Sequence, residues 1–298
     1  MSETPKTILS ATDFSETAAN AGVLARELAR RFSAHLHILH AVILLDDPHL
    51  DKDRSNQLEE LLKSEDEVRR RVLEESIEEQ YGVDITPHMV RGIAPGEVIV
   101  ETAESLGCGL IVMGTHGRRG LSHFFLGSVA ERVLRTSKIP VLTVRGDVVI
   151  NPDGISKILV PHDFSDASDT AVRQAAIWAS SLGARLTLLH VVEPVVYPEF
   201  YSVDVLSEEL TERLVARSED ALRKTAAEFE GGCEVDFRVE IGRAAETIAD
   251  LAGPDDFDLV VMATRGLSGL EHVLLGSVAE SVLRRCRVPM LAIPGGDH

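Results

Sequence analysis

The sequence predicts an α/β protein built from two tandem, doubly wound domains, each a parallel sheet with helices on both faces. The first observation behind this prediction is an internal repeat, which makes the two halves of the 298-residue chain similar to each other. The second is the alternation of short apolar runs with helical patterns, which favours right-handed crossovers and a parallel sheet. The third is the continuous apolar character of runs such as Leu110–Met113, which is typical of strands buried on both faces.

The repeat is visible in two matched pairs of segments. Ile8–Ser15 reads ILSATDFS where Ile158–Ser165 reads ILVPHDFS, an offset of 150 positions. Leu126–Arg135 reads LGSVAERVLR where Leu275–Arg284 reads LGSVAESVLR, an offset of 149 positions. The two copies are therefore almost equal in length, as expected of consecutive domains of one kind.

The repeat also indicates where one domain ends and the next begins. We expect the first domain at residues 1–147 and the second at residues 154–298. Asn151–Gly154 lies between them, reads NPDG and is a turn signal. This linker is too short for independent tumbling, so we expect the two domains to pack together.

Each copy is predicted to contain the same elements in the same order. The strands are expected at 7–10, 35–42, 84–90, 110–113 and 141–144, and at 157–160, 185–192, 234–240, 259–262 and 290–293. A helix rich in alanine and leucine follows the first strand, at 15–32 and 165–182. A long helix follows the second strand, a short helix the third, and a last helix begins at Ser128 or Ser277. Gly82 and the Gly231–Gly232 pair are expected to stop the long helices.

The composition restricts the functional class and the compartment. A formal net charge of -18 disfavours nucleic acid and anionic membranes as partners, because the field of the whole protein repels phosphate. Aromatic residues make up only 4% of the chain, so the core is expected to be aliphatic. Cys108, Cys233 and Cys286 fit neither a metal site nor a disulfide framework. No signal peptide or membrane span is evident, and we expect a cytoplasmic protein.

A glycine-rich loop after the fourth strand is the candidate functional site of the first copy. It reads Gly114-Thr-His-Gly117, then nine residues, then Gly127-Ser128 at the start of a helix. Glycines let a ligand approach main-chain N–H groups, and the free N–H groups and dipole of a helix N-terminus favour an anion. We expect Ser128 either to cap the helix or to donate its hydroxyl to a phosphate oxygen. Local positive charge is expected from His116, Arg118, Arg119 and His123.

This spacing, Gly-x2-Gly-x9-Gly-Ser after a strand, resembles the ATP-binding signature of the universal stress protein family. Thr12–Ser15 and His40–Ala41 are also similar to that family, and the resemblance covers essentially the whole chain as two consecutive family domains. It implies an adenine nucleotide alpha-hydrolase-like fold, in which each domain is a five-stranded parallel sheet of order 3-2-1-4-5. The ligand it implies is ATP or another adenine nucleotide, with or without Mg²⁺.

The resemblance assigns nucleotide-binding positions in both copies. In the first copy these are Ala11, Thr12, Asp13 and Ala41 on the adenine and ribose side, and Met113, Gly114, His116, Gly117, Gly127, Ser128 and Val129 around the ribose and phosphates. In the second copy the corresponding residues are Pro161, His162, Asp163, Val191, Met262, Ala263, Arg265, Gly266, Gly276, Ser277 and Val278. No catalytic residue and no metal ligand is assigned.

The second copy departs from the family pattern in its loop. Ala263 replaces the first glycine, and its methyl group is expected to hinder the approach of a ligand to the backbone. Glu271 lies inside the loop, and Leu267–Ser268 stands in place of the arginine pair, for which Arg265 compensates in part. His162 stands where the first copy has a threonine. We therefore expect weaker nucleotide binding in the second copy.

Simpler interpretations of the same residues remain open. The glycine-rich turns can be purely structural, and Asp13 and Asp163 can be helix-start carboxylates favoured by the helix dipole rather than hydrogen-bond acceptors for a nucleotide. The pattern His35-x-His37-x-x-His40 suggests a metal, but His35 and His37 share one face of a strand while His40 falls on the other.

The functional prediction rests on binding rather than on catalysis. The sequence has no P-loop lysine, no dinucleotide fingerprint and no nucleophile elbow. The leading hypothesis is an ATP-binding regulatory protein of the stress response, in which nucleotide occupancy biases the binding of a partner protein that stays unidentified. The alternatives are a dimeric interaction scaffold that needs no nucleotide and a slow ATP hydrolase with Asp13 as base. The resemblance also implies a homodimer, or an intramolecular pairing of the copies, through the apolar last strands at 141–144 and 290–293.

Overall fold

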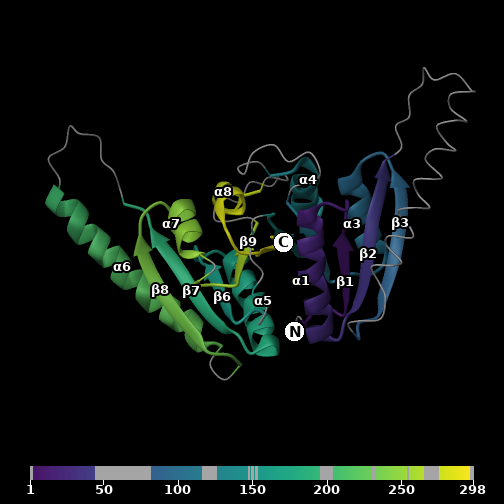
Figure 1. Cartoon of the computed structure of the whole chain (residues 1–298). Helices are drawn as coiled ribbons and strands as arrows, with labels where there is room; N and C mark the ends of the chain where they lie inside the picture. The colour runs from purple at the N-terminus through teal and green to yellow at the C-terminus, as the bar shows by residue number, and fades with distance from the viewer. Residues whose placement is uncertain are drawn as a thin grey trace, which may run out of the picture.

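The computed structural model describes residues 3–43, 82–115, 126–146, 148, 151, 154–194, 204–229, 232–253, 255–264 and 275–295. The strands of these residues form a single ten-stranded sheet, and helices cover both of its faces (Figure 1). The two copies predicted from the repeat lie side by side along this sheet, the first at residues before 147 and the second at residues after 153.

The first copy contributes the first half of the sheet. Its strands are β1 (Thr7–Ala11), β2 (His35–Ile43), β3 (Ile85–Gly92), β4 (Leu110–Gly114) and β5 (Val141–Val144). Its described helices are α1 (Glu16–Phe32), α3 (Pro95–Ser105) and α4 (Ser128–Thr136). The long helix predicted before Gly82 lies outside the described residues, but Gly82 itself has a φ of +61°, the left-handed conformation expected of a helix stop.

The second copy repeats this order and adds the long helix. Its strands are β6 (Lys157–Pro161), β7 (Arg185–Val192), β8 (Val235–Ile241), β9 (Leu259–Ala263) and β10 (Met290–Ile293). Its helices are α5 (Asp166–Leu182), α6 (Asp204–Ala227), α7 (Ala244–Leu251) and α8 (Ser277–Arg285). The predicted strands are therefore present with ends shifted by two residues or fewer.

The strand order within each copy confirms the predicted fold. The first copy runs β3-β2-β1-β4-β5 and the second β8-β7-β6-β9-β10, which is the order 3-2-1-4-5 in both. Neighbouring strands within a copy are parallel. The order reverses beside the first strand of each copy, and such switch points are where open α/β sheets bind ligands, beyond the carboxyl ends of the strands.

The two copies are joined through their last strands. β5 and β10 pair antiparallel, with Leu142 opposite Leu291, and the hydroxyl of Thr143 donates to the carbonyl of Met290 at 3.2 Å. The sequence left open whether this pairing occurs within one chain or between chains, and the structure places it within one chain. Each apolar edge strand thereby covers the other, which removes two exposed sheet edges.

The first helix of each copy begins one residue later than predicted, because a serine caps it. Ser15 precedes α1, and its hydroxyl oxygen accepts the N–H of Ala18 at 3.2 Å. Ser165 caps α5 in the same way through Ser168, also at 3.2 Å. These caps satisfy one of the free N–H groups at each helix start and fix where the strand-to-helix turn ends.

The core is aliphatic, as predicted, and runs through both copies on each side of the sheet. One cluster packs α1, α5 and α6 against one face, and a second packs α3, α4, α7 and α8 against the other. Across the seam, the ring of Phe32 in α1 meets the edge of Trp178 in α5 at a centroid distance of 5.2 Å. Each cluster contains residues of both copies, so the two halves share a core on each face of the sheet.

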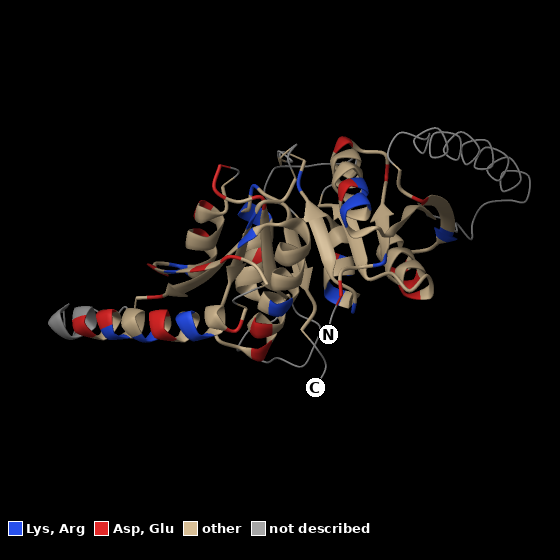
Figure 2. Ribbon diagram, turned by 90° about the horizontal axis from the view of Figure 1, so that it is seen from below, with Lys and Arg blue, Asp and Glu red and all other residues tan. Residues whose placement is uncertain are grey.

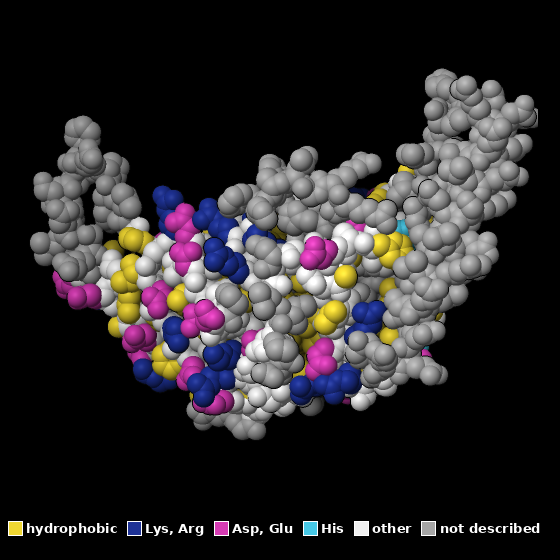
Figure 3. Space-filling view, in the orientation of Figure 1, with side chains coloured by type: hydrophobic (Ala, Val, Ile, Leu, Met, Phe, Trp, Pro, Cys, Tyr) yellow, Lys and Arg dark blue, Asp and Glu magenta, His cyan; other side chains and the backbone are white. Residues whose placement is uncertain are grey.

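Charged residues are frequent along the helices and rare in the strands at the centre of the sheet (Figure 2). Acidic and basic side chains are interspersed on the face seen in Figure 3, most clearly over the second copy. Within the described residues, no helix combines the length and the apolar character that a membrane span requires.

Candidate functional site

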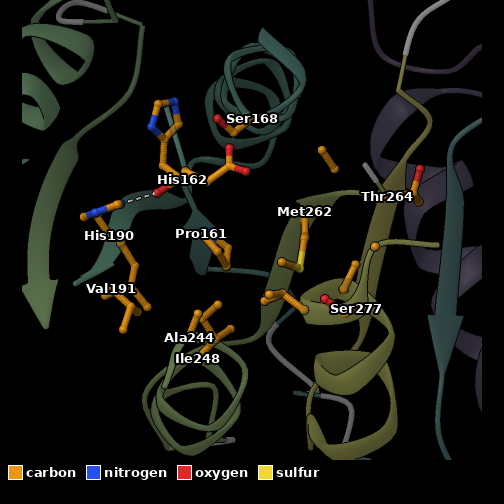
Figure 4. Close-up of a pocket in the computed structure, with 16 residues that line it drawn as sticks. Pro161, His162, Ser168, His190, Val191, Ala244, Ile248, Met262, Thr264 and Ser277 are labelled. Atoms are coloured by element: carbon orange, nitrogen blue, oxygen red, sulfur yellow. Dashed lines mark hydrogen bonds between the residues drawn. The ribbon is translucent and has the colours of Figure 1, made fainter. Parts of the chain in front are cut away.

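A cavity of about 210 Å³ opens at the carboxyl ends of β6, β7 and β9 in the second copy (Figure 4). Its wall also includes the first turn of α8 and two residues of α7, Ala244 and Ile248. Nine of the positions predicted for this copy line it together: Pro161, His162, Asp163, Val191, Met262, Ala263, Gly276, Ser277 and Val278. The other two, Arg265 and Gly266, lie outside the described residues.

The first copy places the equivalent residues at the equivalent strand ends. Ala11 is in register with Leu39 on one side and with Met113 on the other, so β1, β2 and β4 end together. The positions at these ends and at the start of α4 are Ala11, Thr12, Asp13, Ala41, Met113, Gly114, Gly127, Ser128 and Val129. His116 and Gly117, together with Arg118, Arg119 and His123, lie outside the described residues, as do Leu267, Ser268 and Glu271 of the second copy.

The start of each glycine-rich loop is tied to the start of the following helix. The N–H of Gly127 donates to the carbonyl of Thr115 at 2.8 Å, and the N–H of Gly276 donates to that of Thr264 at 2.7 Å. Each threonine N–H in turn donates to the carbonyl of the last residue of the neighbouring strand, at 2.9 Å. These bonds hold the helix N-terminus against the strand ends, where a ligand of an α/β sheet binds.

The helix N-termini differ in one respect from the sequence prediction. Gly127 and Gly276 are the capping residues, with φ of -62° and -58°, so Ser128 is the first helical residue and does not cap the helix. A Cβ on Gly276 would lie 3.2 Å from the carbonyl oxygen of Thr264, which explains a glycine there without any unusual φ. Glycine has no side chain to accept the first N–H groups of α4 and α8, and such groups at a helix start suit an anion.

The first glycine of the loop is explained by packing against α1. A Cβ on Gly114 would lie 2.8 Å from the Cγ2 of Thr17 and 3.2 Å from its carbonyl carbon. In the second copy, Ala263 stands at this position and packs in the same cluster as Ala167, which replaces the threonine. Ala263 also lines the cavity, so the expectation that its methyl group hinders a ligand stays a prediction.

The turn between the first strand and the first helix holds an aspartate in each copy. Asp13 accepts the N–H of Ser15 at 3.0 Å, and Asp163 accepts both the N–H and the hydroxyl of Ser165, at 3.1 and 2.5 Å. These bonds support the structural interpretation of both aspartates as groups that order the helix start. In the second copy Asp163 also lines the cavity, so the two interpretations are compatible there.

A strained phenylalanine follows each aspartate. Phe14 and Phe164 both have a φ of +62°, a left-handed conformation that bulky residues rarely adopt. Their rings pack against His40 and His190 at centroid distances of 4.7 and 4.5 Å. Such strain persists only where the surroundings hold it, and it concentrates at functional sites.

Two histidines that sequence reasoning did not assign to the site hold this turn from the second strand. The Nδ1–H of His40 donates to the carbonyl of Thr12 at 2.8 Å. The Nδ1–H of His190 donates to the carbonyl of His162, also at 2.8 Å (Figure 4). The available signal was the match of His40 and His190 in the repeat, together with their position at the end of the strand.

His162 does in the second copy what Thr12 does in the first. The hydroxyl oxygen of Thr12 accepts the N–H of Phe14 at 3.0 Å, and the Nδ1 of His162 accepts that of Phe164 at 3.3 Å. The other ring nitrogen of His162 bonds to a carboxylate oxygen of Asp169 at 2.9 Å, and the imidazole is almost fully buried. The exchange of threonine for histidine therefore preserves the turn.

Two of the histidines of β2 pack with one another and with a histidine of β3. His35 and His37 share a face, as predicted, with ring centroids 4.4 Å apart, while His40 packs with the turn at the other end of the strand. His88 from β3 joins the first two, and its Nε2 lies 2.9 Å from the Nδ1 of His37. Among the described residues, no group of three His, Cys, Asp or Glu side chains is arranged to hold a metal ion.

Two relatives show how far the similarity to known proteins extends. Universal stress protein MJ0531 of Methanocaldococcus jannaschii is 38% identical over 141 residues, which cover 47% of this chain and 82% of that protein. Universal stress protein Rv2005c of Mycobacterium tuberculosis is 31% identical over 189 residues, which cover 61% of this chain and 60% of that protein.

The solved structures extend the comparison to the whole chain. A universal stress protein from Archaeoglobus fulgidus aligns with a TM-score of 0.66 at 23% identity. The alignment covers 99% of this chain and 98% of the Archaeoglobus chain. The protein PA1789 from Pseudomonas aeruginosa aligns with a TM-score of 0.64 at 21% identity. At this level of identity the two structures are evidence for the fold alone. The family model described as the universal stress protein family matches residues 4–145 and again residues 154–294, and the chain therefore belongs to the universal stress protein family as a member with two tandem copies.

Proposed function

We propose that this protein binds an adenine nucleotide, ATP in the first instance, at the carboxyl edge of each copy, and that occupancy regulates its binding to a partner protein. The observation that carries the proposal is the cavity of the second copy, where nine positions implied by the family resemblance come together. The first copy has the same strand ends and the same helix start, with the complete glycine pattern in its sequence.

The groups around the cavity suit the parts of a nucleotide. Val191, Met262 and Ile248 supply apolar surface for a base. The first turn of α8 supplies N–H groups, a favourable dipole and the hydroxyl of Ser277 for phosphates. This local arrangement counters the net charge of -18, which would repel an anion at longer range. A magnesium ion would be carried by the phosphates, since the described residues offer no metal site of their own.

The proposed output is regulation rather than turnover. Asp13, the base of the alternative hydrolase hypothesis, accepts the N–H of Ser15 and is engaged in ordering the turn. The nucleotide-independent scaffold is the remaining alternative, and the pairing of β5 with β10 is the observation that favours it. That pairing is equally compatible with a nucleotide-regulated protein, so the experiment below must separate the two.

We further propose that the first copy binds the nucleotide more tightly. Ala263 lines the cavity of the second copy, and its methyl group adds bulk where the first copy has a glycine. The formal charge of the loops also favours the first copy. Its loop carries two arginines, Arg118 and Arg119, whereas the charges of Arg265 and Glu271 in the second loop cancel each other. Positive charge near phosphates strengthens binding, and most strongly at low ionic strength.

Identification of the natural ligand requires purified protein and a chromatographic assay. The protein is denatured and the supernatant is analysed for adenine nucleotides. Released ATP supports the proposed function, and ADP in place of ATP supports slow turnover. The scaffold is supported if the supernatant contains no adenine nucleotide and the purified protein also shows no saturable binding of added ATP.

The difference between the copies is tested with one aspartate variant of each. Gly127→Asp and Gly276→Asp each place a carboxylate at a helix cap, where it repels phosphate. Because a Cβ on Gly276 would lie 3.2 Å from the carbonyl oxygen of Thr264, the thermal unfolding midpoint of each variant is measured as a control. We expect Gly127→Asp to remove the tighter class of ATP sites in a calorimetric titration and Gly276→Asp to remove the weaker one. Equal losses from the two variants would contradict the proposed asymmetry.

A further inference from the structure

A buried arginine of the first copy reaches the end of a helix of the second. Arg145 follows β5 directly and is only 9% exposed. Its Nη1 donates to the carbonyl of Arg284 at 2.7 Å and to that of Cys286 at 3.2 Å. These two carbonyls belong to the last turn and the cap of α8, so the first copy supplies a cationic cap for this helix.

The opposite end of α8 forms part of the candidate site. Gly276 and Ser277 begin the helix and line the cavity, while Arg285 and Cys286 end it. A nine-residue helix is about 13 Å long, so a shift at one end is transmitted to the other as a rigid-body movement. Apolar packing of Val282 against the core is non-directional and fixes the position of the helix along its axis less sharply than two hydrogen bonds do.

The backbone that carries Arg145 is itself fixed. Val144, the preceding residue, accepts the N–H of Thr115 at 2.9 Å, which ties it to the glycine-rich loop of the first copy. One residue earlier, Thr143 bonds across the seam to Met290. The backbone at Arg145 is therefore held by two contacts, one with the glycine-rich loop of the first copy and one with β10 of the second.

The contact is not reciprocated by the second copy. The position that follows β10 is Pro294, which has no side-chain donor. After the corresponding helix of the first copy, α4, Ser137 orders the turn that follows: it donates its hydroxyl to the carbonyl of Ile139 at 2.8 Å and accepts the N–H of that residue at 3.0 Å. Cys286 takes the place of Ser137 in the second copy, and a thiol is a much weaker hydrogen-bonding group.

We propose that Arg145 is a positioning residue for the ligand site of the second copy, which is complete only when the first copy is docked against it. The inference rests on the proposed function, because it concerns the ATP affinity of that site. It makes the dependence one-sided: the second site needs Arg145 of the first copy, and the first site needs no equivalent residue of the second.

The test measures ATP affinity at each site separately in the full chain. The Gly127→Asp background isolates the second site, and the Gly276→Asp background isolates the first. We expect Arg145→Met to weaken ATP binding about three- to tenfold in the first background, as loss of charge-assisted hydrogen bonds suggests, and to change it less than about twofold in the second. Arg145→Lys keeps the charge and should restore part of the affinity.

The matched control removes an arginine whose ion pair lies within its own helix. Arg135 pairs with Glu131 within α4, and Arg135→Met should leave both affinities as in the parent. Trp178 is the only tryptophan of the chain and packs against Phe32 across the seam, so an unchanged emission spectrum shows that the halves stay docked.

Hydrogen exchange supplies a readout that needs no nucleotide. In Arg145→Met, the amides of α8 should exchange faster while those of α4 stay unchanged. Equal weakening of both sites by Arg145→Met, or no weakening of the second with α8 exchange unchanged, would overturn the inference. If the Gly127→Asp protein with Arg145 intact binds no ATP, the proposed function of the second site is overturned, and this inference with it.

Discussion

At the scale of single residues, His37 shows how the environment sets a protonation state. Burial, followed by the neighbouring imidazoles of His35 and His88, lowers the pKa of His37 to about 4 from the ordinary value of 6.5. Burial also lowers the pKa of His88. These imidazoles are therefore neutral in the folded protein at pH values where the unfolded chain already binds protons.

The pH dependence of stability follows from this depressed pKa. Because the unfolded chain takes up a proton near pH 6.5, the contribution of His37 is complete above that pH and is lost as the pH falls towards about 4. Thr187 occupies the equivalent buried position of β7, so His37→Thr introduces a side chain that this fold already accepts. We expect the variant to lose less stability than the parent between about pH 7 and about pH 4.5, measured by urea unfolding. An identical loss in both proteins would contradict this assignment.

The residues of the site were predictable to different degrees. The repeat and the strand ends suffice to place Asp13, Asp163 and the glycines, because these are properties of the backbone path. The contacts of His40 and His190 were not predictable, since they depend on the side-chain reach from one strand to the turn of another. The same holds for Asp169, which gains its role only through His162.

At the scale of elements, the contact between β4 and α1 explains a difference between the copies. Gly114 packs against Thr17 in the first copy, and Ala263 and Ala167 stand at the two equivalent positions in the second, so the larger strand residue occurs with the smaller helix residue. Sequence reasoning related the exchange of glycine for Ala263 only to the approach of a ligand, because a local pattern does not reveal which helix residue packs against the strand.

This packing is testable with a double-mutant cycle. Gly114→Ala alone should destabilise the chain by about 1–3 kcal/mol, because the new methyl group overlaps Thr17. Combined with Thr17→Ala, the same substitution should cost at least about 1 kcal/mol less, since that pair reproduces the second copy. Chemical unfolding of the parent, the two single variants and the double variant measures the coupling. Strictly additive costs would show that the two side chains do not meet.

The bounds of the elements were mostly predictable because they depend on local signals. Ser15 and Ser165 are typical capping residues, and the apolar runs end where the turns begin. The start of α4 was less certain, because Gly127 and Ser128 are both acceptable caps and only the bond from Gly127 to Thr115 decides between them.

At the scale of the whole molecule, the seam between the copies determines the architecture. The apolar strands at 141–144 and 290–293 indicated that each needs a partner, but two similar apolar edges can pair within a chain or between chains. The shared core on both faces and the pairing of β5 with β10 make the two copies one continuous body. No local pattern encodes that choice, since it depends on how the short linker brings the halves together.

The most direct test of the central claim is a calorimetric titration of the full chain and of the double variant Gly127→Asp/Gly276→Asp with ATP. Both proteins should unfold cooperatively on heating, because aspartate is a favourable helix cap, while the crowding of a Cβ on Gly276 against the carbonyl of Thr264 lowers the midpoint of the variant. The account predicts saturable ATP binding to the parent and its loss in the double variant. An absence of saturable binding to the parent, or equal binding to both proteins, would contradict the assignment of the strand ends and the starts of α4 and α8 as nucleotide sites.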